Sequence, residues 1–103
     1  YYMENKYSLN LKMIEDARER IKNYIVNTPL IKSTYLTNND KNVYYKLENT
    51  QEVRAFKIRG ALNKMLSLSP SEKEIGVATI SSGNHGISVA LGAQLLGKKM
   101  PLL

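Results

Sequence analysis

The sequence predicts an α/β protein built on a parallel sheet. Three observations support this fold class. Apolar residues recur at three- and four-residue steps over residues 9–26, 55–66 and 86–96, as on one face of a helix. Short apolar runs of strand type occupy residues 43–47 and 76–80, and turn-forming residues separate these segments. Helices that alternate with strands along a chain are typical of an α/β protein with a parallel sheet.

The first predicted helix, over residues 9–26, has the clearest apolar face, made of Leu11, Ile14, Ala17, Ile21 and Ile25. We expect Asn27-Thr28-Pro29 to end it, because proline disfavours helical geometry in the residue before it. A turn is expected at residues 38–42 and a strand at residues 43–47. Ser69-Pro70-Ser71 is expected to break the second helix, and Gly97 to end the third.

Composition narrows the class of protein. The chain has 103 residues, enough for one small domain, and its 43% hydrophobic and 23% charged residues are ordinary for a folded protein. The absence of cysteine excludes disulfides and thiolate metal sites and suits a reducing compartment, so we expect a cytoplasmic protein. No apolar run approaches the roughly 20 residues of a membrane span, so a membrane is not an expected partner.

The net charge of +6 is a reason to consider nucleic acid as a partner, because a positive surface attracts the phosphate backbone. The basic residues are spread along the chain, however, and Lys98-Lys99 is the only adjacent basic pair. Nucleic-acid binding usually shows a clustered basic footprint. We therefore expect no nucleic-acid partner and interpret the charge as a solvated surface.

The segment from Ser81 to Gly86 joins a predicted strand directly to a predicted helix. Such a turn aims backbone N–H groups and the positive end of a helix at one place, which suits a carboxylate or phosphate. The same residues are equally compatible with an ordinary helix cap made by a serine or asparagine. His85 is the single histidine, so a metal site built on several histidines is excluded.

Lys57 is predicted to stand at the start of a helix, beside Phe56. A helix N-terminus disfavours positive charge, and so do the neighbouring Arg54 and Arg59, which together favour the neutral, nucleophilic amine. A neutral amine is what covalent chemistry with a carbonyl requires. From the residues alone, an exposed lysine in a basic surface turn is the more common case. Gly60 in the same helix hints at close packing against another segment.

Three stretches, in this order and spacing, resemble the threonine/serine dehydratase family of fold-type II pyridoxal-phosphate enzymes. They are Glu48-Asn49-Thr50-Gln51, Ala55-Phe56-Lys57-Ile58-Arg59-Gly60-Ala61 and Ser81-Ser82-Gly83-Asn84-His85-Gly86. The resemblance extends over residues 14–97. It implies the N-terminal part of a tryptophan synthase β-like fold, with residues 1–103 as a single incomplete catalytic domain.

The resemblance also implies roles for individual residues. Lys57 would bind the aldehyde of pyridoxal 5′-phosphate covalently and later take the substrate's α-proton. Phe56 would pack beside the cofactor ring, and Asn84 would hydrogen-bond its 3-hydroxyl. Ser81, Ser82, Gly83, Asn84 and His85 would hold the carboxylate of a small amino-acid substrate. Threonine would then give 2-oxobutanoate and ammonia, and serine would give pyruvate.

Two alternatives stay open. The same motifs resemble serine racemase, in which a serine at the place of Ser82 acts as the acid and base on the opposite face of the substrate. The chain also departs from the family pattern, because Ala55 stands where serine is usual and no glycine-rich phosphate loop follows. We therefore expect weak or no activity from this chain alone. Its apolar helix faces favour self-association, so we expect a homo-oligomer.

Overall fold

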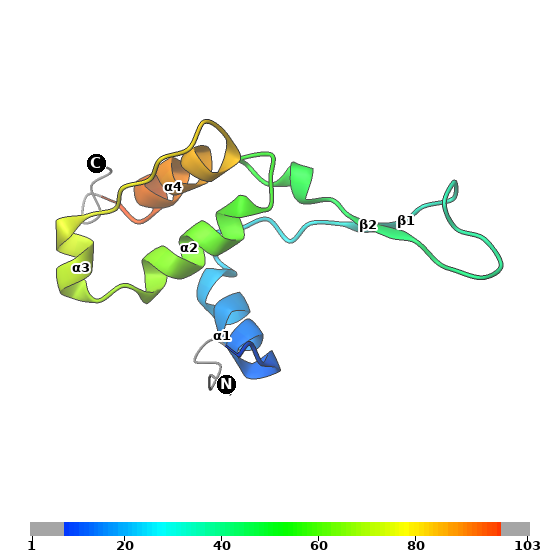
Figure 1. Ribbon diagram of the computed structural model, residues 1–103, viewed down its shortest axis with the longest axis horizontal. Coiled ribbons are helices and arrows are strands. Elements are labelled where there is room, and N and C mark those ends of the chain that lie inside the picture. The colour runs from blue at the N-terminus through cyan, green and yellow to red at the C-terminus, as the bar shows by residue number, and fades with distance from the viewer. Residues whose placement is uncertain (1–7, 98–103) are drawn as a thin grey trace, which may run out of the picture.

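The computed structural model describes residues 8–97, so the basic pair Lys98-Lys99 lies outside it. Figure 1 shows the helices gathered together, with a β-hairpin that extends from them as an arm. In chain order the elements are α1 (Leu11–Ile21), β1 (Leu30–Lys32), β2 (Tyr44–Lys46), the 3-10 helix η1 (Glu48–Thr50), α2 (Lys57–Ser67), α3 (Pro70–Ile75) and α4 (Asn84–Leu95).

Helix α1 is shorter than the apolar pattern predicts. The side chain of Asn10 caps its start by accepting a hydrogen bond from the Met13 N–H at 2.9 Å. The helix ends at Ile21, well before Asn27-Thr28-Pro29, so that prediction is wrong. The cause is tertiary: both main-chain groups of Val26 are hydrogen-bonded to the side chain of Gln51, which holds this segment in an extended path.

The arm is an antiparallel pair of strands. β1 and β2 pair with Leu30 opposite Lys46 and Lys32 opposite Tyr44. The prediction of a turn at residues 38–42 is confirmed, because the Asn38 side chain accepts hydrogen bonds from the N–H groups of Asp40 at 2.9 Å and Lys41 at 3.1 Å. The strand predicted over residues 43–47 is confirmed as β2. β1 was not predicted, since three residues are too few for a clear alternating pattern.

The core is centred on α2, which packs between α1 and α4. On one side Ile58 and Leu62 contact Ile21 of α1 and Val53, and Leu62 is fully buried. On the other side Ala61, Met65 and Val89 form a second apolar cluster. Gly92 of α4 lets the two helices approach closely, because a Cβ there would lie 2.9 Å from the Met65 sulfur. Gly60 shows no such contact, with nothing within 4 Å of a Cβ, so the predicted close packing there is wrong.

Two further sequence predictions need correction. Ser69-Pro70-Ser71 ends α2 but also begins α3: Ser69 and Glu72 form a reciprocal capping box, and Pro70 occupies the first turn, where its missing N–H is harmless. The strand predicted over residues 76–80 forms only an isolated bridge at Val77. A strand requires a hydrogen-bonded neighbour, and within residues 8–97 the one sheet is the antiparallel hairpin.

Candidate active site

Lys57 is the first residue of α2, as the sequence predicts. Its side chain and that of Phe56 are both exposed, and the Lys57 Nζ lies 5.7 Å from the centre of the Phe56 ring. This is within the range of a cation–π contact. The arrangement presents an accessible primary amine with an aromatic surface beside it, at the positive end of a helix.

The loop before α4 carries the remaining predicted residues. Ser81, Ser82 and Gly83 line a shallow hollow of about 380 Å³ together with Gly86, Ile87 and Ala90. The cap residue of α4 is Gly83, and no side chain caps the helix. The interpretation of this segment as a serine or asparagine cap is therefore wrong. The first N–H groups of α4 stay available for an anion, which is the property of an anion-binding turn.

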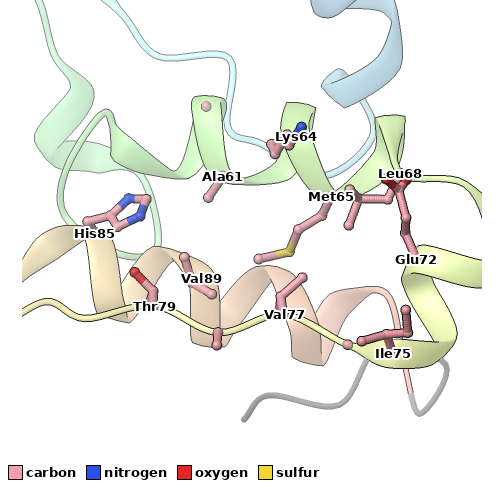
Figure 2. Close-up of a pocket in the computed structure, with 13 residues that line it drawn as sticks. Ala61, Lys64, Met65, Leu68, Glu72, Ile75, Val77, Thr79, His85 and Val89 are labelled. Atoms are coloured by element: carbon pink, nitrogen blue, oxygen red, sulfur yellow. The ribbon is translucent and has the colours of Figure 1, made fainter.

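Asn84 and His85 lie in the first turn of α4. The Asn84 carbonyl accepts a hydrogen bond from the buried Ser88 hydroxyl at 2.7 Å, which stabilises this turn. His85 lines a different space, an apolar groove of about 420 Å³ between α2, α3 and α4 (Figure 2). The structure thus separates His85 from the hollow that holds Ser81, Ser82 and Gly83. Neither lining includes Lys57 or Phe56.

The start of α2 and the start of α4 lie at the same end of the helix pair. Gly60 in the first turn of α2 and His85 in the first turn of α4 line the same groove, and further along Met65 meets Gly92. The two helices therefore run side by side in the same direction, as Figure 1 also shows. The positive end of α2, at Lys57, and the positive end of α4, after the loop at residues 81–83, therefore lie at the same end of the helix pair. Two such helix ends favour a negatively charged ligand.

A polar network holds the first turn of α2, which carries Lys57, and the sequence did not predict it. Arg59 donates two hydrogen bonds to Glu48, each 2.7 Å long, in a bidentate ion pair. The Thr28 hydroxyl donates to the same carboxylate at 2.6 Å. A bidentate arginine–carboxylate pair is stronger and more directional than a single contact. The signal in the sequence was the Glu48-Asn49-Thr50-Gln51 stretch, which no local pattern connects to α2.

This network determines the charge of Glu48. Its hydrogen bond to Arg59, with smaller contributions from Thr28 and Gln51, lowers the pKa of Glu48 from 4.5 to about 2, against the opposing effect of burial. Hydrogen bonding to Glu48 correspondingly raises the pKa of Arg59. The pair stays ionised at every physiological pH, so it can hold α2 without taking or releasing protons.

Known proteins match this chain over most of its length. A model of the family described as pyridoxal-phosphate dependent enzyme matches residues 21–102. The chain belongs to this family. Among curated members, the catabolic L-threonine dehydratase TdcB of Staphylococcus aureus strain N315 is 47% identical over 97 residues. The match covers 92% of this chain and 28% of that enzyme, so the chain spans about 28% of the relative's length.

Solved structures of family members share the fold. Maize serine racemase superposes with a TM-score of 0.79 at 38% sequence identity, and the superposition covers 93% of this chain and 30% of the racemase chain. A threonine deaminase from T.th. superposes with a TM-score of 0.76 at 36% identity, and covers 92% of this chain and 33% of its own. The predicted fold class, the N-terminal portion of a fold-type II pyridoxal-phosphate enzyme, is confirmed by these similarities.

The residues present fit the family cofactor in part. An exposed amine beside an aromatic ring can meet an aldehyde on a flat, aromatic molecule, and an uncapped helix start can meet an anionic group. Within residues 8–97, no group of three His, Asp or Glu side chains lies close enough together to bind a metal ion. In the same residues, no helix is long and apolar enough to cross a membrane.

Proposed function

We propose that this chain contributes the lysine-bearing part of a pyridoxal-phosphate-dependent threonine dehydratase, which converts L-threonine to 2-oxobutanoate and ammonia. The observation that supports it most is the accessible Lys57 amine at the start of α2, next to Phe56, in a chain 47% identical to a threonine dehydratase over most of its length. A small amino acid would be the substrate, with serine, which gives pyruvate, as a second one.

Pyridoxal phosphate, when bound, supplies an electron-withdrawing ring that stabilises negative charge at the substrate's α-carbon. The protein's own residues would hold the cofactor and the substrate in place and would transfer the protons. The Lys57 amine would bind the aldehyde and, once the substrate amine has displaced it, accept the α-proton. Phe56 would pack beside the ring, and Asn84 would hydrogen-bond the 3-hydroxyl.

The uncapped turn from Ser81 to His85 would hold the substrate carboxylate through its N–H groups. Ser81, Ser82 and Gly83 line the hollow beside this turn, which supports them as the carboxylate-binding residues, whereas His85 lines the groove. His85 would act only if its side chain turned away from that groove.

A second candidate is racemisation of serine. It is favoured by the similarity to maize serine racemase and by the exposed hydroxyl of Ser82, which can exchange a proton with solvent. The two candidates share Lys57 and differ in the need for Ser82. A Ser82→Ala variant would lose racemisation, whereas any dehydration of threonine should stay at the level of the unsubstituted chain, because the turn would hold the carboxylate through main-chain N–H groups that the substitution leaves in place.

The test of the proposed function is a chemical map of lysine reactivity. The chain is mixed with pyridoxal phosphate, reduced with borohydride to make the amine–aldehyde bond permanent, and digested for peptide mapping. We expect the label on Lys57 and its loss in Lys57→Ala. Lys64→Ala, which removes another lysine of the same helix, is the matched control and should leave the label in place.

Labels spread evenly over the exposed lysines would contradict the proposal. They would favour the other hypothesis, a chain that is silent alone and acts by self-association. That hypothesis is motivated by the many exposed large apolar side chains, among them Tyr35 at 93% and Ile80 at 103% exposure. Sedimentation of the purified chain would show whether a homo-oligomer forms. We expect little 2-oxobutanoate from this chain alone.

A further inference from the structure

The segment that carries Lys57 is anchored before and after the lysine. Before it, the Gln51 side chain is almost fully buried and is hydrogen-bonded to both main-chain groups of Val26 at 2.9 Å. After it, Arg59 grips Glu48 through two hydrogen bonds of 2.7 Å. Glu48 and Gln51 belong to one short stretch around η1, and the Gln51 Nε2 also donates to the Glu48 carboxylate at 3.3 Å. Both anchors therefore share one support.

The geometry of α2 lets the Glu48–Arg59 ion pair hold the helix without covering the Lys57 amine. Residues two positions apart on an α-helix point about 200° apart around its axis. Lys57 and Arg59 therefore face opposite sides, with the exposed lysine directed away from the ion pair. Ile58 between them is buried in the apolar core and fixes the rotation of this turn.

The loop between the anchors is under strain. Arg54, three residues before Lys57, has a φ of 62°, which a non-glycine residue adopts at a cost of about 1 kcal/mol. Val53 and Ala55 on either side are buried, and the Arg54 N–H donates to the Gln51 carbonyl at 2.8 Å. Such a conformation persists only where the surroundings hold it.

We propose that Glu48 is a positioning residue for Lys57: through Arg59 it holds the first turn of α2, and with it the amine, in one orientation against the strained loop. This inference rests on the proposed function of Lys57. The ion pair contacts neither substrate nor cofactor in this scheme. A misplacement of about 1 Å can lower the rate of a positioned reaction by up to about a hundredfold.

The experiment compares four forms of the full chain: wild type, Glu48→Gln, Glu48→Asp and Asp16→Asn. Asp16→Asn breaks an ion pair of the same 2.7 Å length, with Lys12 on α1, and is the matched control. The measurement is the rate of pyridoxal phosphate labelling of Lys57 divided by that of Lys64 in the same sample. An unfolded chain would label both lysines alike and would also lower this ratio, so circular dichroism of each form distinguishes loss of positioning from loss of the fold.

In Glu48→Gln we expect the ratio to fall by about tenfold while circular dichroism keeps the helical signal. Glu48→Asp retains the carboxylate and should restore part of the ratio, and Asp16→Asn should leave it unchanged. Hydrogen exchange of the peptide over residues 52–60 is the second readout. It should accelerate in Glu48→Gln, whereas the peptide over residues 61–67 should not.

The outcomes separate the two proposals. If the wild type shows no preference for Lys57, the proposed function fails, and exchange alone decides the inference: faster exchange over residues 52–60 in Glu48→Gln supports it. If the wild type prefers Lys57 and Glu48→Gln keeps both the ratio and the exchange rate, the inference is overturned and the proposed function stands.

Discussion

Loss of the Glu48 carboxylate should lower the stability of the chain by an amount that depends on pH. The pKa of Glu48 falls from 4.5 to about 2 on folding, about 2.5 units. At 1.36 kcal/mol per unit this sets an upper limit of about 3 kcal/mol. The Arg59 side chain is 33% exposed and that of Glu48 17%, so solvent screens the pair. We expect Glu48→Gln to lower the free energy of unfolding by about 1–2 kcal/mol at pH 7.

The direction of the pH dependence follows from the sign of the shift. The folded state binds the proton of Glu48 less tightly than the unfolded state. Its contribution to stability is therefore fully present above pH 4.5 and is lost as the pH falls toward about 2. Glu48→Gln carries no titrating group at this position, so the difference between wild type and variant should shrink over the same range.

The assay is urea unfolding at pH 7, 5, 4 and 3, followed by far-ultraviolet circular dichroism and by the fluorescence of the seven tyrosines. Asp16→Asn is the control, because its exposed ion pair should contribute under about 1 kcal/mol. A difference between wild type and Glu48→Gln that stays constant from pH 7 to pH 3 would refute the reasoning, since it would show that the ion pair does not hold the Glu48 pKa down.

Three pairs of substitutions test the packing and the backbone, each by urea unfolding. Leu62→Ala should cost about 3 kcal/mol because Leu62 is fully buried, whereas Leu11→Ala, at a 69% exposed position, should cost under about 1 kcal/mol; equal losses would contradict the position of the core. Arg54→Gly should stabilise the chain by up to about 1 kcal/mol by relieving the positive φ, while Arg54→Ala removes the same side chain and should not. Gly60→Ala should raise the free energy of unfolding by about 0.5–1 kcal/mol, because its new methyl group meets no other atom. Gly92→Ala should raise it less, because its methyl group would contact the Met65 side chain. A larger increase for Gly92→Ala than for Gly60→Ala would contradict the close approach of α2 and α4.

Local patterns in the sequence determined most helices and the hairpin turn. The apolar spacing that predicts α2 and α4 reflects a helical period that any burial against a neighbour requires, so both were located to within two residues. The position of Lys57 at a helix start followed from the same pattern. The capping box of Ser69 and Glu72 was also visible in the sequence, although proline in between was interpreted only as a break.

The tertiary structure decided what depends on distant partners. Nothing near Val26 reveals that Gln51, 25 residues away, ends its helical path, and nothing near Lys57 reveals that Glu48 holds Arg59. The apolar run over residues 76–80 has the composition of a strand but, within residues 8–97, no partner to pair with. Period and capping are properties of neighbouring residues and can be read from the chain; hydrogen-bond pairing and ion-pair geometry depend on segments that only folding brings together.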